Sequence, residues 1–198
     1  RLHQSGPTVS QTVARLERDG LLTGQDNRRI ELSEIGWERA RKVMRKHRLA
    51  ERMLSDIIGL DYSIVHEEAC KLEHVFGDAI EERLTVLLNS PQLSPYGCPI
   101  PSLEGELHPE VFREGVVALA EVVTGEVQSF NLVRLSEFVQ ADEMSLTGLK
   151  DVGVVPDVAI SAVEVHSAVE IRGPEGRVRV ATALAGGPWG ADKEAVAN

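Results

Sequence analysis

Six side chains with metal-ligand chemistry occur at helical spacing in one segment of this sequence, so binding a shared ion would oblige its helices to pack together. His47 and Glu51 are four residues apart in a strongly helical stretch, residues 37–58. Their side chains therefore stack on one face and can share an ion. The other four ligand-type residues are His66, Cys70, Glu73 and His74.

A second helix is expected over residues 62–89. Cys70, Glu73 and His74 stand at i, i+3 and i+4 within it, and so present a thiolate, a carboxylate and an imidazole together. His66 lies one turn before Cys70, where it can face the pair on the first helix across a packing contact. The spacing thus predicts two neighbouring metal ions per chain.

The donor atoms limit the choice of metal. A single His/Glu pair is usually a solvated surface pair and a lone helical cysteine is usually core, but four ligand-type residues within residues 66–74 are harder to explain that way. Mixed sulfur, nitrogen and oxygen donors favour iron(II), cobalt, nickel or zinc over calcium or magnesium. The spacing is not that of a zinc finger, because Cys-x-x-Cys is absent and the second cysteine is Cys98.

Length and composition set the outer limits. With 198 residues the chain is long enough for one large domain or two or three small ones. Its two cysteines form no even framework, and the sequence has neither an apolar run of membrane length nor a secretory leader. We therefore expect a reduced, cytoplasmic protein with no membrane partner.

Charge is distributed unevenly along the chain. The net charge of −10 is unusual for a DNA-binding protein. However, residues 1–50 hold 11 Lys and Arg against 6 Asp and Glu, a balance of +5, which leaves 10 against 25, or −15, for residues 51–198. This asymmetry predicts a nucleic-acid module attached to an acidic body.

A helix-turn-helix pattern begins at Ser5, which can cap a helix whose first turn contains Pro7, and Gly20 ends that helix. Gln11 suits an adenine edge and Pro7 a thymine methyl, while hydroxyls and arginines suit phosphates. The apolar stripe consists of Val9, Val13 and Leu16, and the outward set consists of Thr8, Ser10, Gln11, Arg15 and Arg18. The outward side chains are those that a helix in the major groove needs.

The next residues predict a hairpin, the wing of a winged helix. Two leucines are followed by the turn-rich residues 23–27 and the alternating residues 28–32. Arg28 lies at the tip, where it can contact the DNA backbone. An ordinary amphipathic helix followed by a hairpin would give the same pattern, so the pattern alone does not specify DNA binding.

The second half of the chain predicts a connector and a small β barrel. Residues 92–109 are rich in Pro, Gly and Ser, as connectors are, and residues 146–155 predict a helical turn. No closing strand is expected beyond residue 180. The alternating apolar stretches that predict the barrel are residues 126–135, 157–165 and 168–171, with a turn at 172–176.

Four sequence blocks resemble the iron-dependent repressors related to the diphtheria toxin repressor. The blocks are SGPTVSQTVARLERDGL, VMRKHRLAERML, VHEEACKLEHV and SPYGCPIP, and the resemblance extends over residues 1–180. It implies a homodimer, mainly α with small β parts: a winged helix-turn-helix, a helical dimerisation and metal-binding domain, and a C-terminal SH3-like β barrel. The corresponding domain bounds are 1–41, 42–108 and 109–191, with a tail at 192–198.

The resemblance further implies the function. Divalent metal, above all iron(II), with two ions per chain, activates such proteins to repress iron-uptake and related genes at palindromic operators in double-stranded DNA. Cobalt, nickel, manganese or zinc would substitute for iron.

The resemblance also assigns residues to sites. An ancillary metal site takes His47, Glu51, His66, Glu137 and Gln140, and a primary, activating site takes Cys70, Glu73 and His74. An anion beside the ancillary metal is held by Arg48 and Ser94. The residues that approach DNA are Ser5, Pro7, Thr8, Ser10 and Gln11.

Two departures from the family pattern affect these expectations. Arg1 falls inside the helix-turn-helix of the family, so we expect an N-terminally truncated chain whose primary site lacks one ligand from a preceding helix. Cys98 stands where some relatives have an asparagine near the anion, which weakens the prediction of an anion contact there.

Two other functions were weighed. A manganese-responsive regulator of the same family is the closer alternative, although the soft ligand Cys70 favours iron. A di-metal helical-bundle enzyme is the other, but its Glu-x-x-His repeats are missing because Glu73 and His74 are adjacent. The sequence also has no nucleophile elbow, phosphate loop or dinucleotide fingerprint. We therefore expect no enzyme.

Overall fold

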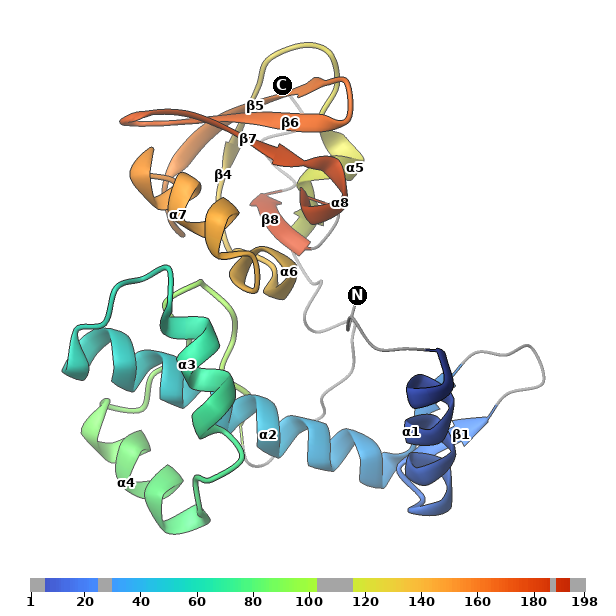
Figure 1. The fold of residues 1–198 in the computed structure, drawn as a ribbon. Helices are drawn as coiled ribbons and strands as arrows, with labels where there is room; N and C mark the ends of the chain where they lie inside the picture. The colour runs from blue at the N-terminus through green and yellow to red at the C-terminus, as the bar shows by residue number, and fades with distance from the viewer. Residues whose placement is uncertain (1–5, 25–29, 103–115, 186–187, 193–198) are drawn as a thin grey trace.

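The N-terminal part of the chain is a helix followed by a hairpin, as the sequence predicts. The computed structural model describes residues 6–24, 30–102, 116–185 and 188–192 (Figure 1). Helix α1 (Gly6–Arg18) leads into strands β1 (Leu22–Gly24) and β2 (Ile30–Leu32), which pair antiparallel with Leu22 opposite Leu32. Ser5 and Arg28 lie outside the described residues.

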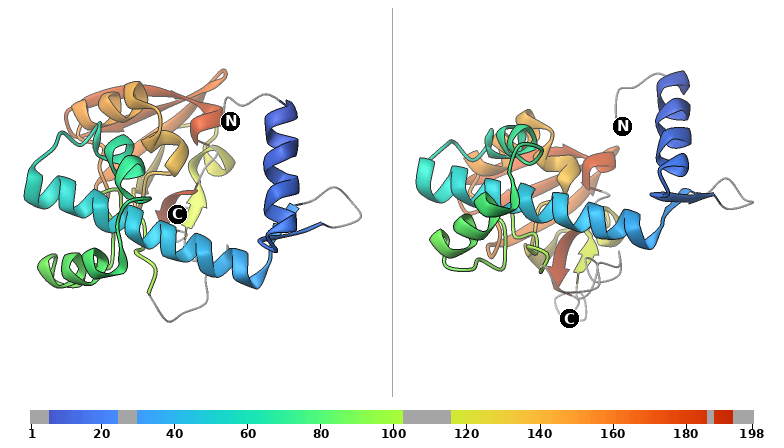
Figure 2. Two further views of the ribbon diagram at one scale, coloured as in Figure 1. Left: turned by 60° about the horizontal axis from the view of Figure 1, so that its bottom comes forward. Right: turned by 90° about the horizontal axis from the view of Figure 1, so that it is seen from below.

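A long helix, α2 (Glu34–Met53), connects the hairpin to the rest of the molecule (Figures 1 and 2). Ser33 caps it by accepting a hydrogen bond from the Gly36 N–H at 3.0 Å. The helix continues as the π-helical turn η1 (Leu54–Ile58) and ends at Gly59, whose φ of 73° is favourable only for glycine. The predicted helix over 37–58 is thus confirmed.

The predicted single helix over residues 62–89 is wrong. The structure has two helices, α3 (Val65–Leu72) and α4 (Asp78–Leu87), separated by a turn. Gly77 is extended at φ −72° and ψ 165° and starts α4, because glycine loses much conformational freedom inside a helix.

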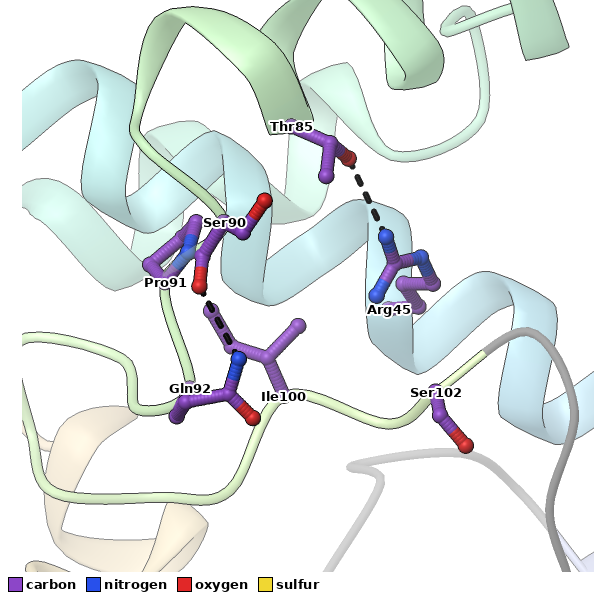
Figure 3. A pocket seen from close by; sticks show the side chains of 7 residues that line it. All are labelled: Arg45, Thr85, Ser90, Pro91, Gln92, Ile100 and Ser102. Carbon is purple, nitrogen blue, oxygen red and sulfur yellow. Dashed lines mark hydrogen bonds between the residues drawn. The ribbon is translucent and has the colours of Figure 1, made fainter.

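The break lets α4 fold back onto α2. There Arg45 donates to Glu81 at 2.7 Å and to the Thr85 hydroxyl at 3.0 Å (Figure 3). These contacts border a pocket of about 470 Å³ that is open to solvent. Because Arg45 is already bonded to protein atoms, its role here is to hold the two helices together.

The C-terminal part contains two antiparallel sheets. Strands β4 (Gln128–Asn131), β5 (Ala159–Val165), β6 (Ala168–Gly173) and β7 (Gly176–Ala181) pair in that order. Strands β3 (Val116–Ala118) and β8 (Pro188–Asp192) form a separate pair. The expectation that no strand follows residue 180 is therefore wrong: β7 ends at Ala181, and β8 obtains its backbone hydrogen bonds from β3.

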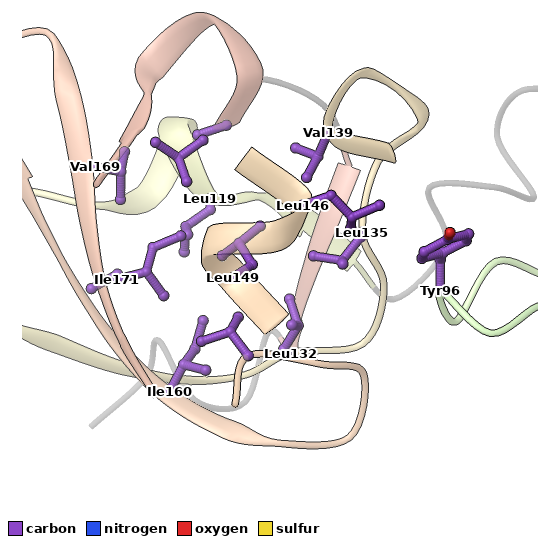
Figure 4. Close-up of a cluster of buried hydrophobic side chains, with 14 of the residues drawn as sticks. Tyr96, Leu119, Leu132, Leu135, Val139, Leu146, Leu149, Ile160, Val169 and Ile171 are labelled. Carbon is purple, nitrogen blue, oxygen red and sulfur yellow. The ribbon is translucent and has the colours of Figure 1, made fainter. Parts of the chain in front are cut away.

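Short helices and the two sheets enclose the hydrophobic core of the C-terminal part (Figure 4). The helices are α5 (Leu119–Val122), α6 (Glu137–Gln140), α7 (Glu143–Asp151) and α8 (Thr182–Ala185). Along β6, Val169 and Ile171 point to the same face of the strand and are fully buried in this core. The fold is thus a mixture of helix and strand instead of mainly α, because the described part of residues 116–192 supplies six of the strands.

The helical part and the C-terminal part are in contact. Figure 1 shows α6 and α7 on the side of the C-terminal part that faces α3, whereas α1 lies at the far end of α2. The Leu135 N–H donates to the Tyr96 carbonyl at 2.9 Å, and Lys150 forms an ion pair with Asp61. Gly97 allows this approach, because a Cβ there would lie 2.2 Å from the Val133 carbonyl oxygen. No helix among the described residues has the length and apolarity needed to span a bilayer.

Candidate metal centre

His47 is the centre of a buried polar cluster between α2 and α3. Its Nε2 lies 2.8 Å from Glu51 Oε1 and 3.2 Å from His66 Nδ1. Its Nδ1 lies 2.8 Å from Glu73 Oε2. Burial of polar groups is costly unless they are paired. The fold therefore keeps these side chains inside the protein by pairing them with one another.

His66 and Cys70 extend the cluster along α3. His66 Nδ1 lies 3.2 Å from Glu51 Oε1, and the Cys70 Sγ lies 3.7 Å from His66 Nε2. One donor atom each from His47, His66 and Cys70 can be chosen so that all lie within 4.8 Å of one another. The two sets of ligands that the sequence separates are therefore adjacent in space, with His47 touching members of both.

Glu51 supplies an observation that favours a cation here. The residue is 1% exposed, and its Oε2 has no hydrogen-bond partner among the residues that the structure describes. A buried carboxylate oxygen without a partner is unfavourable, whereas a divalent ion would satisfy it. The S, N and O donors present fit a transition metal of intermediate softness.

The protonation of the cluster is strongly shifted. Burial alone would lower the pKa of His47 and His66, but hydrogen bonds with Cys70 and Glu51 raise the pKa of His47 to about 12 and that of His66 to about 9. The same hydrogen bonds with the two imidazoles lower the pKa of Cys70 to about 7. Without a metal, the imidazoles of His47 and His66 are therefore protonated on nitrogen atoms that would otherwise bind the ion.

His74 does not join the other ligands. Residues 73–75 form a turn after α3, so the helical spacing on which the prediction depends ends at Leu72. The His74 side chain is 71% exposed, and its Nε2 lies 3.2 Å from Glu73 Oε1. Glu73 is thus the residue between His74 and the buried cluster.

Glu137 and Gln140 lie on α6 in the C-terminal part and are bonded to other protein groups. Arg48 Nη2 donates to Glu137 Oε1 at 2.9 Å. The Gln140 amide donates to the Leu135 carbonyl at 2.6 Å and to the Cys98 Sγ at 3.5 Å. Both side chains form hydrogen bonds with other protein groups. No described contact joins either of them to His47, Glu51 or His66.

The predicted anion pair, Arg48 and Ser94, is buried. Arg48 also donates to the Pro99 carbonyl, and the Ser94 hydroxyl accepts from the Tyr96 N–H at 3.2 Å. Burial raises the pKa of the nearby Cys98 thiol. The sequence did not reveal that Cys98 holds Gln140 or that Tyr96 touches α3. The SPYGCPIP block was the available signal.

The predicted DNA-contacting residues on α1 are exposed to solvent wherever the structure describes their side chains. Pro7 lies in its first turn. The Val13 and Leu16 side chains are partly buried, as the apolar stripe predicts, but the third member of the stripe, Val9, is 41% exposed. The exposed members of the predicted set are Thr8, Ser10, Gln11, Arg15 and Arg18.

Known proteins resemble this chain in sequence. Residues 33–102 match the family model for the iron dependent repressor, metal binding and dimerisation domain. The iron-dependent repressor IdeR of Mycobacterium tuberculosis is 49% identical over 164 residues, which cover 81% of this chain and 71% of that protein. The chain belongs to the family of iron-dependent repressors.

Further relatives agree with this assignment. The diphtheria toxin repressor of Corynebacterium glutamicum is 46% identical to this iron-dependent repressor over 181 residues, 90% of this chain and 75% of that protein. A solved structure of a manganese-dependent transcriptional repressor in complex with manganese superposes with a TM-score of 0.76 at 26% identity. The superposition covers 97% of this chain and 87% of the chain of the manganese-dependent repressor.

Proposed function

We propose that this chain is a transcriptional repressor that divalent metal activates to bind operator DNA, and that iron(II) is the activating metal for iron-uptake and related genes. The observation that carries the proposal is the buried cluster around His47, in which Glu51 Oε2 has no hydrogen-bond partner among the described residues. Two members of the cluster, His47 and Glu51, lie on α2, the helix that directly follows the hairpin and α1.

Two ions per chain are proposed. His47, Glu51 and His66 would hold an ancillary ion together with Glu137 and Gln140. Cys70, Glu73 and His74 would hold a primary ion, for which the exposed His74 side chain would have to turn towards Cys70. Glu137 would have to exchange its bond with Arg48 for the metal, and Gln140 its bond with Cys98. A bound ion would supply the positive charge that balances the carboxylates and the thiolate. It would replace the protons that the imidazoles carry without metal.

Metal would act by selecting one arrangement of the elements. The proposed ligands lie on α2, on α3 and the turn after it, and on α6, so they bind one ion together only when these elements are held in place. Such an ion favours that arrangement over others. A coupling of roughly 1–3 kcal/mol per site is enough for a useful switch.

The DNA contacts are proposed for α1 and the hairpin. The side chains of Gln11 and of the exposed hydroxyl residues would meet base edges and phosphates, and Arg15 and Arg18 would contact phosphates. Two copies of α1 in a dimer would occupy successive major grooves of a palindromic operator. Pro7, together with Ser5 and Arg28 outside the described residues, completes the proposed surface.

The dimer surface is proposed on α4. Ile80 and Leu87 are seven residues apart on this helix and are 46% and 66% exposed, and Val86 is 74% exposed. Exposed apolar side chains that gather on one helix favour burial against a second copy. The matched family domain is a dimerisation domain, which supports this choice.

The C-terminal part is proposed to be an SH3-like domain with bounds near 109–191, after a helical domain over 42–108 and a winged helix over 1–41. The antiparallel order of β4 to β7 and the pairing of β3 with β8 support a barrel-like closure. The continuous run of α2 from Glu34 to Met53 means that the first two domains share one helix.

Manganese is the second candidate metal, because a manganese-dependent repressor shares the fold at 26% identity. The thiol of Cys70 favours iron(II). Titration with each metal in turn, monitored by binding to a palindromic operator, distinguishes the two. We expect iron(II) to act at lower free concentration than manganese(II), and the reverse order would favour the manganese regulator.

A further inference from the structure

The start of α3 obtains a hydrogen bond from a distant segment. The first N–H groups of a helix have no partner within the helix, and the N-cap residue of α3, Ile64, has no side chain that can accept a hydrogen bond. The His66 N–H instead donates to the Tyr96 hydroxyl at 3.2 Å. Tyr96 therefore acts on the helix that carries His66 and Cys70.

The Tyr96 hydroxyl is itself held in place. It donates to the Tyr62 carbonyl at 2.7 Å, and the Tyr96 side chain is fully buried. Its ring packs on that of Tyr62 at a centroid distance of 4.7 Å. Burial raises the pKa of Tyr96, so the phenol stays protonated and keeps its donor at physiological pH.

The backbone of the same residue contacts the C-terminal part. The Tyr96 carbonyl accepts from the Leu135 N–H at 2.9 Å, and Leu135 precedes Glu137 by two residues. Figure 4 shows Tyr96 on its own loop, beside the cluster that contains Leu135. One residue thus bonds both to the helix that carries His66 and to the segment that leads to Glu137 and Gln140.

We propose that Tyr96 is a positioning residue that couples the metal ligands of α3 to the C-terminal part, with its hydroxyl fixing the start of α3 and thereby the place of His66. The inference deepens the proposed function, because it assumes that the cluster around His47 binds metal. Groups that orient ligands typically change metal affinity by about 10–100-fold when they are removed.

The test compares Tyr96→Phe with Tyr62→Phe. The first variant keeps the ring and removes both hydrogen bonds of the hydroxyl. The matched control keeps the stacked ring and loses only a long contact of 3.4 Å between Tyr62 Oη and the Pro95 carbonyl. Cobalt(II) serves as the probe, titrated into the full chain and followed by its visible absorption.

We expect Tyr96→Phe to weaken cobalt binding by about 10-fold or more and to alter the absorption spectrum, while Tyr62→Phe changes the affinity by less than about 2-fold. A residue with a purely structural role would lower the melting temperature equally with and without cobalt and leave the affinity unchanged. That result would overturn the inference.

Amide hydrogen exchange of the unaltered chain provides an independent measurement if Tyr96→Phe does not fold. Cobalt should slow exchange at the amides of both His66 and Leu135, and slowing at only one of them would overturn the coupling. Absence of cobalt binding by the unaltered chain would instead contradict the proposed function, so the two failures are distinguishable.

Discussion

At the scale of single residues, the buried ligands of the cluster are held by one another. Glu51 Oε1 lies within 3.2 Å of both His47 and His66, whereas its Oε2 has no partner among the described residues. Helical spacing predicted the pair of His47 and Glu51, with His66 facing it across a packing contact, and the family resemblance assigned the three residues to one site. It could not show that Glu73 would also touch His47, because this contact depends on the turn that ends α3.

Glu51→Gln should remove the charge that the metal needs while keeping the shape of the side chain. We expect a loss of metal affinity of 10-fold or more, and a loss of roughly 1–3 kcal/mol in the free energy of unfolding of the metal-free protein, because buried charged hydrogen bonds are lost. Metal titration and urea denaturation measure the two effects.

The control for Glu51→Gln is Glu67→Gln. Glu67 is exposed and forms a surface ion pair with Lys71 at 2.9 Å. Its substitution should change the free energy of unfolding by less than about 1 kcal/mol and leave the metal affinity unchanged. Equal effects of both substitutions on metal affinity would argue against Glu51 as a ligand.

Metal affinity should rise with pH. The pKa of His47 is raised to about 12 and that of His66 to about 9. Both side chains are therefore imidazolium cations at neutral pH, and a metal must displace one proton from each. Increasing the pH towards 9 makes this displacement easier for His66. Calorimetry in two buffers of different ionisation enthalpy should show proton release on binding, and binding without proton release would contradict the assigned ligands.

At the scale of elements, helix α1 and the long helix α2 with η1 were predicted from local sequence, while the break before α4 and the strand β8 were not. The cap, Pro7 in the first turn and Gly20 predicted α1. Ser33 and Gly59, which were not used in the prediction, mark the two ends of α2 and η1. The break at residues 73–77 has a local signal in Gly77, which helical periodicity does not detect, and the Arg45–Glu81 ion pair then holds α4 on α2. The strand β8 depends on a tertiary contact, its pairing with β3. Periodicity within one segment carries no information about such contacts.

Gly36→Ala should loosen the joint between the hairpin and α2. A Cβ at Gly36 would lie 2.1 Å from the Leu21 carbonyl oxygen, so the two elements would have to move apart at a cost of about 1–3 kcal/mol. We expect weaker operator binding with unchanged metal affinity, measured by fluorescence anisotropy and metal titration.

Gly125→Ala is the matched control, since nothing lies within 4 Å of a Cβ at that position. It should leave both affinities unchanged. A loss of metal affinity in Gly36→Ala would show that the metal cluster and the hairpin joint are not separable elements.

At the scale of the whole molecule, the cluster around His47 lies between the end that carries α1 and the hairpin and the C-terminal part. The resemblance of four sequence blocks predicted the order of the parts and the family, and the comparisons confirm the family. It did not give the partners of Glu137 and Gln140. Those partners, Arg48 and Cys98, come from contacts between segments far apart in sequence.

Leu87→Glu should convert a dimer into a monomer, because it places a charge in the proposed apolar surface of α4. Sedimentation velocity measures the outcome. Val127→Glu is the control: Val127 is 57% exposed in the C-terminal part, and its substitution should leave the dimer intact. Dissociation by both substitutions, or by neither, would place the dimer surface elsewhere.

The central claim is that metal binding in the cluster around His47 switches DNA binding. Its most direct test is the affinity of the chain for a palindromic operator, measured by fluorescence anisotropy with iron(II) under anaerobic conditions and with a chelator instead. The account predicts operator binding that is at least about 10-fold tighter with metal and that loses this dependence in Glu51→Gln. Equal operator affinity with iron(II) and with the chelator would contradict it.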